Sequence, residues 1–127
     1  MADEELKFWT TPPNVFLVAT SKEADNKVLG CISYRVINPT TVEMHRLSVD
    51  SSLRGLRIGE KLVNALQDTA KENGYEAMYL ETSSAQIAAI KLYKRLQFNF
   101  LHRCKFEYPF LDIISGLYVV AFMKSLK

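Results

Sequence analysis

Residues 47–62 read LSVDSSLRGLRIGEKL, and this stretch decides the fold. A β-rich run ends at Val49, a basic turn that contains glycine follows, and a helix begins near Ile58. The first N–H groups of a helix have no acceptor within the helix, and the helix dipole favours negative charge there. The sequence therefore predicts a phosphate-binding turn at the start of this helix.

The segments on either side of this turn follow two different apolar patterns. Before the turn, β-rich segments alternate with polar turns, which predicts an antiparallel meander of strands. After it, apolar residues at helical spacing predict a helix that ends at Gly74. A second helix is predicted up to about Leu96, with Ser83 and Gln86 as its capping box. The predicted strands cover residues 14–20, 27–37, 41–49, 76–81, 99–106 and 116–124. This order predicts an α/β fold with a mixed sheet.

Length, composition and charge limit the class of protein. A chain of 127 residues is long enough for one domain and too short for two. We expect an irregular lead-in over residues 1–13, which ends in two prolines, and a single domain over residues 14–127. The net charge of +2 argues against a dedicated nucleic-acid binder, because such proteins usually carry a strong basic patch.

Neither a membrane span nor a secretory signal is expected. No apolar run reaches the length of about 18 residues that a membrane-spanning helix needs. The acidic start, MADEE, is unlike a signal peptide. Cys31 and Cys104 are far apart in the sequence, and we interpret them as reduced, partly buried thiols of a cytoplasmic protein.

The third predicted strand has an irregular apolar pattern. Val42 and Met44 share one parity, whereas Leu47 and Val49 have the other, and a regular strand keeps one parity for its buried side. A bulge near His45 and Arg46 would account for the change, and bulges often lie next to active sites. A central strand that is buried on both faces is the alternative.

Two motifs together resemble the GNAT acetyltransferase superfamily. The turn of that family reads Gln/Arg-x-x-Gly-x-Gly/Ala, and residues 54–59 read RGLRIG, with Arg57 in place of the middle glycine. The downstream family signature, Asn-x-x-Ala-x-x-Leu-Tyr-x-x-x-Gly-Phe, is present as QIAAIKLYKRLQF over residues 86–98, where Gln86 replaces the asparagine and Gln97 the glycine. RLSV at 46–49, LETS at 80–83 and YPF at 108–110 are similar to the camello-type group, which includes the cysteine S-conjugate N-acetyltransferase. The likeness covers residues 16–124.

The resemblance implies a GNAT-like, mostly antiparallel sheet with flanking helices and an enzyme that uses acetyl-CoA. Such an enzyme transfers acetyl directly to a primary amine on a small molecule or a protein. Backbone N–H groups of residues 56–60 would hold the pyrophosphate, and the pantetheine arm would pair along residues 47–49, where an N–H would polarise the thioester carbonyl. The implied cofactor-binding residues are Leu47, Ser48, Val49, Arg54, Gly55, Leu56, Arg57, Ile58, Gly59, Glu60, Gln86 and Tyr93.

The resemblance also indicates catalytic residues. Tyr93 would protonate the leaving sulfur, and core packing is its alternative role. Glu43 or Glu81 would serve as the base through water. The alternative for each is an ordinary carboxylate at the end of a strand. His45 is a lone histidine within a strand, and we interpret it as structural. No metal site is expected, since the sequence has no cluster with metal-ligand spacing.

One departure concerns the N-terminus. The superfamily fold begins with a strand and two helices that line the acceptor site, and here we expect them to be missing or reduced to residues 6–13. A non-catalytic CoA-binding or protein-interaction module on a shortened fold is therefore the alternative function. The open sheet edge favours a homodimer, in which a second copy would cover the acceptor site. The near-neutral charge does not identify the amine.

Overall fold

The structure, a computed structural model, describes residues 3–23, 25–53, 55–105 and 118–127. The chain divides into two compact units. The first unit is Met1–Met78 with Leu126–Lys127, and the second unit is Tyr79–Ser125. The expectation of a single domain over residues 14–127 stays a prediction.

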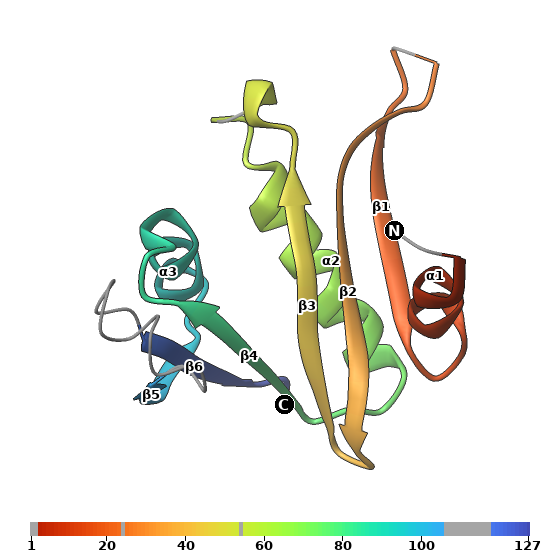
Figure 1. Ribbon diagram of the computed structural model, residues 1–127. Coiled ribbons are helices and arrows are strands. Elements are labelled where there is room, and N and C mark those ends of the chain that lie inside the picture. Colours follow the sequence, from red (N-terminus) through yellow and green to blue (C-terminus); the bar gives the residue numbers. More distant parts are fainter. Residues whose placement is uncertain (1–2, 24, 54, 106–117) are drawn as a thin grey trace. The chain divides into compact units, whose positions relative to one another are not determined.

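The first unit contains the predicted meander (Figure 1). Its elements are α1 (Asp3–Thr10), β1 (Val15–Ser21), β2 (Lys27–Asn38), β3 (Thr41–Val49), the short 3-10 helix η1 (Ser51–Leu53) and α2 (Ile58–Glu72). β1 pairs with β2, and β2 with β3, both antiparallel. The predicted irregular lead-in was wrong for residues 3–10, which form α1.

Helix α2 covers one face of this three-stranded part. Its buried stripe consists of Ile58, Leu62, Val63, Leu66 and Ala70, at the helical spacing that the sequence shows. On the strands, Ile32, Tyr34, Val42 and Met44 are buried. The Tyr34 hydroxyl lies 3.0 Å from the amide nitrogen of Asn73, which follows α2.

Helix α1 contacts β1 and β2 and carries Trp9 to the other face of the strands. The Trp9 ring is buried and contacts the ring of His45. His45 follows Met44 on β3, and successive strand residues point to opposite faces. Because Met44 shares the face of Tyr34, which bonds the end of α2, Trp9 and α2 lie on opposite faces.

The predicted bulge in β3 is confirmed. Ser33 of β2 pairs with His45 of β3, and Cys31 of β2 pairs with Ser48 of β3. Two residues of β2 therefore span the same length of ladder as three residues of β3. The extra residue is accommodated at Arg46, whose backbone is left-handed with φ 58°. The bulge therefore explains why the apolar parity changes between Met44 and Leu47.

The second unit holds most of β4 (Ala77–Ser83), followed by α3 (Ile87–Arg95), β5 (Asn99–Lys105) and β6 (Tyr118–Ser125). The strand order is β4-β6-β5, and β5 and β6 are antiparallel. The predicted capping box was wrong. Ser83 is the last residue of β4, its hydroxyl accepts the N–H of Ala85 at 3.1 Å, and α3 begins at Ile87 with Gln86 as N-cap and no side-chain cap.

The described residues thus contain six strands and three α-helices, and the pairs β1–β2, β2–β3 and β5–β6 are antiparallel. This confirms the predicted α/β class with a mostly antiparallel sheet. The predicted YPF segment at 108–110 and the start of the last predicted strand, residues 116–117, lie outside the described residues. Within the described part of the chain, none of the helices has the length and apolar character needed to cross a membrane.

Candidate active site

The turn between β3 and α2 is built from its own hydrogen bonds. The Asp50 carboxylate accepts the backbone N–H of Ser52 at 3.0 Å and its hydroxyl at 2.9 Å. The bond from the Ser52 backbone has the larger effect and the bond from its hydroxyl the smaller, and both lower the pKa of Asp50 from its usual value. The N–H of Leu53 donates to the carbonyl of Asp50 at 3.0 Å, which closes η1. These hydrogen bonds therefore hold residues 50–53 directly after β3.

Arg57 is the N-cap of α2 and explains a departure from the family motif. Its backbone is left-handed, with φ 57° and ψ 29°, the conformation in which glycine is the usual residue. A residue with a side chain is disfavoured there by about 1–2 kcal/mol. The Arg57 side chain is 72% exposed and lies 3.5 Å from the Glu60 carboxylate. Arginine thus keeps the turn that the family glycine makes, and its side chain extends into solvent.

The start of α2 offers hydrogen-bond donors to an anion. The N–H groups of Ile58 and Gly59 stand in the first turn of a 15-residue helix, where no intrahelical acceptor exists, and no side chain caps them. Gly55, with φ 90°, has no atom within 4 Å of the place where a side chain would begin, so the turn is open on that side. The predicted donor at Leu56 was wrong, because its N–H donates to the carbonyl of Leu53 at 3.3 Å. Arg54 lies outside the described residues.

The end of β3 lies against a glycine that the sequence analysis did not single out. Gly30 of β2 pairs with Val49, and a Cβ at Gly30 would lie 2.6 Å from the Ser48 carbonyl oxygen and 3.1 Å from a Leu62 methyl group. Only glycine lets the two strands and α2 approach this closely. Leu47 and Val49 are half-buried and Ser48 is exposed, so the predicted strand segment 47–49 has one accessible side chain.

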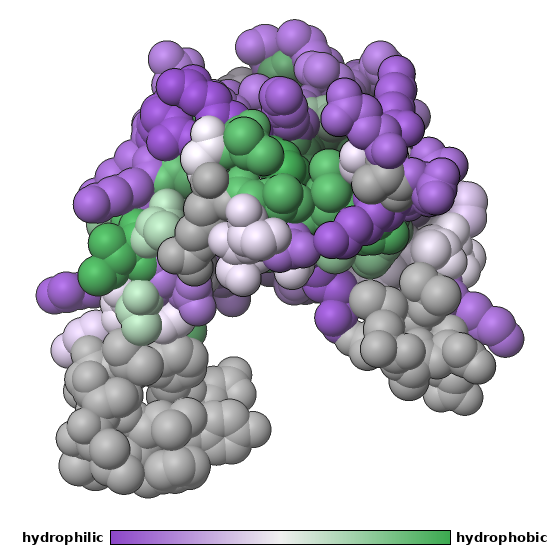
Figure 2. All heavy atoms as spheres, turned by 90° about the horizontal axis from the view of Figure 1, so that it is seen from above, coloured by the Kyte–Doolittle hydropathy of each residue, from purple (hydrophilic) through white to green (hydrophobic). Residues whose placement is uncertain are grey.

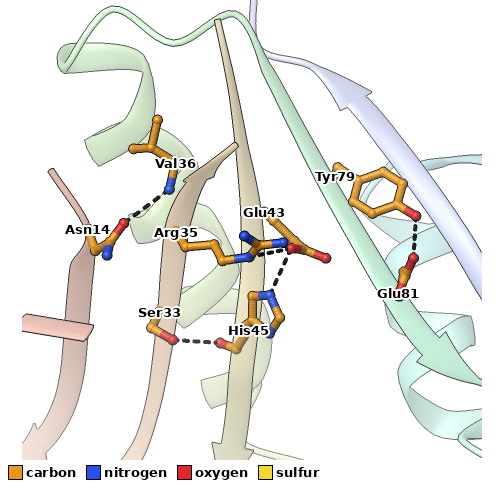
Figure 3. Close-up of polar contacts among 8 residues, drawn as sticks. All are labelled: Asn14, Ser33, Arg35, Val36, Glu43, His45, Tyr79 and Glu81. Carbon is orange, nitrogen blue, oxygen red and sulfur yellow. Dashed lines mark hydrogen bonds and ion pairs between the residues drawn. The ribbon is translucent and has the colours of Figure 1, made fainter. Parts of the chain in front are cut away.

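Glu43 lies on β3 beside Arg35 of β2 and His45 of its own strand (Figure 3). Its carboxylate is buried and lies 2.7 Å from Arg35 Nε and 3.0 Å from His45 Nε2. Burial alone would raise the pKa of Glu43, but the contacts and charges of His45 and then Arg35 outweigh burial and lower it. A carboxylate that stays ionised in this way is a weak proton acceptor.

The remaining predicted site residues belong to the second unit. Glu81 is exposed and accepts a hydrogen bond from the Tyr79 hydroxyl at 2.6 Å (Figure 3). Tyr93 on α3 is 6% exposed, and its ring contacts those of Phe98 and Phe122. Burial raises the pKa of Tyr93 to about 12, so the hydroxyl keeps its proton at neutral pH. Gln86, the N-cap of α3, is exposed.

Sequence reasoning missed Trp9, Arg35 and Gly30. A signal existed for Arg35, because residues 35 and 43 are equally far from Pro39, and a hairpin centred there sets them opposite each other. Trp9 carried no such signal, because its partners His45 and Arg46 are distant in the sequence. Among the residues that the structure describes, no group of three or more His, Cys, Asp or Glu is placed to hold a metal ion.

The family match spans the residues of both motifs. Residues 1–98 match the family model described as Acetyltransferase (GNAT) family. The chain is 36% identical over 101 residues to "Probable N-acetyltransferase camello" of Xenopus laevis, which covers 78% of this chain and 45% of that protein. It is also 36% identical over 100 residues to human N-acetylaspartate synthetase, and this match covers 78% of this chain and 32% of that protein. The chain thus spans less than half the length of these two curated relatives.

Solved structures agree with this match at the level of the fold. An aminoglycoside 6'-N-acetyltransferase complexed with coenzyme A superimposes with a TM-score of 0.81 at 19% identity, covering 98% of this chain and 79% of that chain. An acetyltransferase of the GNAT family from Staphylococcus aureus has a TM-score of 0.78 at 20% identity, with coverage of 98% and 75%.

Proposed function

Because the chain belongs to the acetyltransferase (GNAT) family, we propose that it transfers an acetyl group from acetyl-CoA to a primary amine. The observation that carries this proposal is the start of α2, where a left-handed Arg57 presents the open first turn of a long helix. Backbone donors, the helix dipole and a guanidinium together fit a pyrophosphate. The same turn is where the family motif is found.

The residues that would hold acetyl-CoA follow from this placement. The N–H groups of Ile58 and Gly59 would bind the pyrophosphate, and Arg57 would add charge to it. The strand segment 47–49 would pair with the amides of the pantetheine arm, because the bulge at Arg46 interrupts the β2–β3 ladder just before it. When bound, acetyl-CoA supplies a thioester carbonyl that an amine attacks.

The leaving thiolate needs a proton, and Tyr93 suits that role. Its hydroxyl stays protonated at neutral pH because burial raises its pKa to about 12. The Phe98 and Phe122 rings hold the tyrosine ring in place. The proton on the attacking amine must also be removed, and we propose that either Glu43 or Glu81 takes part in this step through water.

The finer features are proposals of the same kind. The acceptor is a primary amine of a small molecule or a protein. Two free cysteines, of which Cys104 is exposed rather than partly buried as expected, support a reducing compartment such as the cytoplasm.

A homodimer is supported by β1, which pairs only with β2 among the described strands and exposes Val18. Hydrophobic side chains stand among hydrophilic ones on the surface drawn in Figure 2. Sedimentation that shows only monomer at high concentration would contradict the dimer.

Calorimetric titration with acetyl-CoA, paired with release of free CoA in the presence of amines, tests the function. We expect one-to-one binding that is lost in Gly59→Trp, because an indole in the first turn of α2 blocks the backbone donors. Asn64→Trp, at an exposed position of the same helix, is the matched control and should bind normally. Binding without acetyl transfer to any of a broad set of amines would favour the non-catalytic module. Absence of binding by the unmodified chain would refute the proposal.

A further inference from the structure

His45 has a position that a merely structural histidine does not need. Its Nε2 lies 3.0 Å from Glu43 Oε1. The same nitrogen is buried and has no partner with hydrogen-bond geometry, so the contact with the carboxylate is electrostatic. The side chain as a whole is 36% exposed, so the accessible part of the ring lies away from Nε2.

The carboxylate selects one form of the ring. A negative charge beside Nε2 favours the tautomer that carries its proton there, and the lone pair is then on Nδ1. Nδ1 lies on the side of the ring turned away from Glu43 (Figure 3). Such an imidazole accepts a proton on Nδ1, and the neighbouring carboxylate stabilises the cation that forms.

Several contacts fix the ring and its backbone. The Trp9 and His45 ring centroids are 5.0 Å apart at a tilt of 49°. The Ser33 hydroxyl donates to the His45 carbonyl at 3.1 Å, and the Cys31 thiol contacts the Arg46 carbonyl at 3.5 Å. These side chains of β2 therefore hold both carbonyls of the bulge.

The charged groups around His45 are few. In the described part of the first unit, Arg35 and His45 share the Glu43 carboxylate oxygen Oε1, and Arg46 lies with its guanidinium 5.3 Å from the Trp9 ring centroid. α1 contributes the uncharged Trp9. Since Arg35 already pairs with Glu43, the carboxylate is held in one orientation whatever the charge of His45.

We propose that His45 is the base that removes the proton from the attacking amine, and that Glu43 is the residue that positions it. The inference rests on the proposed acetyl transfer and replaces direct proton transfer to Glu43. One strand carries the whole arrangement. His45 precedes the bulge and Leu47 follows it, so the base lies about 6–7 Å along β3 from the N–H groups proposed to polarise the thioester.

In the proposed transfer one proton moves to His45 and another leaves Tyr93. The amine nitrogen gives one proton to His45 Nδ1 and forms a bond with the thioester carbonyl carbon. The carbon–sulfur bond breaks, and the sulfur leaves with the electron pair. Tyr93 gives its hydroxyl proton to that sulfur, and the His45 and Tyr93 side chains then return to their starting forms by exchange with water. The products are the amide and CoA.

His45→Gln tests the proposal, with His102→Gln as the matched control. His102 is exposed on β5 and lies outside the proposed machinery. We expect kcat to fall about 100-fold or more in His45→Gln, while the calorimetric affinity for acetyl-CoA stays unchanged. His102→Gln should retain both the rate and the acetyl-CoA affinity of the unmodified chain.

Glu43→Gln gives an independent readout. Loss of the negative charge beside Nε2 removes the preference for the tautomer that carries its proton there, so kcat should fall at unchanged acetyl-CoA affinity and the nitrogen NMR signals of the His45 ring should change. Unchanged ring nitrogen signals would overturn the pairing. Full activity in His45→Gln would overturn the base role and leave acetyl transfer standing. An unmodified chain that neither binds acetyl-CoA nor acetylates any amine would refute acetyl transfer and the base role with it.

Discussion

Replacing Arg57 with glycine should stabilise this protein, although it removes a charged side chain and adds backbone freedom. The left-handed backbone at Arg57 is disfavoured by about 1–2 kcal/mol for any residue with a side chain. Glycine loses about 0.5–1 kcal/mol more conformational entropy on folding. The exposed pair with Glu60, at 3.5 Å, contributes at most about 0.5 kcal/mol. The net expectation is a gain of about 0.5 kcal/mol in the free energy of unfolding.

Urea unfolding and thermal melting measure this gain. For a chain of this length about 0.5 kcal/mol corresponds to roughly 2 °C in Tm. Arg57→Ala keeps the strained backbone and loses the pair, so Arg57→Gly should exceed it by about 1 kcal/mol. Ala65→Gly, at an exposed interior position of α2, is the control and should lose about 1 kcal/mol. Equal stability of Arg57→Gly and Arg57→Ala would refute the assignment of the strained turn to residue 57.

Three further predictions concern other parts of the structure. The pKa of Glu43 is lowered in the fold, so its ionised carboxylate stabilises the protein above the ordinary pKa of glutamate, and this contribution is lost as pH falls through the lowered pKa. Glu43→Gln should therefore flatten the curve of unfolding free energy between about pH 5 and pH 3. It should cost about 1 kcal/mol at pH 7, because Arg35 loses its ion pair but its exposed part stays in water. A curve as steep as that of the unmodified chain would contradict this. Gly30→Ala should cost about 1–3 kcal/mol in urea unfolding, since its Cβ would lie 2.6 Å from the Ser48 carbonyl, and an unchanged midpoint would show that the strands separate freely. Tyr93→Phe should lower kcat by about 100-fold while acetyl-CoA still binds, and an unchanged rate would assign the hydroxyl a packing role only.

Much of the fold could be predicted because local chemistry decides it. The strand pattern before residue 50 and the helix pattern after it are visible in the sequence. Side chains on one face repeat about every two residues in a strand and about every 3.6 residues in a helix. The bulge at Arg46 was predictable from the parity of four apolar residues, because one inserted residue moves every later side chain to the other face. The turn before α2 followed from its glycines and arginines.

Other local signals were misleading. Ser83 and Gln86 have the spacing of a capping box, yet Ser83 ends β4 and Gln86 itself becomes the N-cap of α3. A capping motif states only that a helix begins nearby, and strand pairing decides how far the preceding strand extends. Leu56 likewise lies among the predicted phosphate donors, but its N–H is used within the turn.

The family, the order of elements, the turn proposed to bind phosphate and the residue types available for proton transfer are all visible in the chain's local patterns. Only the tertiary structure decided which of these residues act together. Glu43 is held by Arg35 across a hairpin, and His45 is held by Trp9 from the N-terminal helix. The physical reason is that burial and charge pairing depend on distances between residues far apart in the chain, and no local pattern encodes them. Tertiary contacts therefore lower the pKa of Glu43 and place the His45 ring beside its carboxylate.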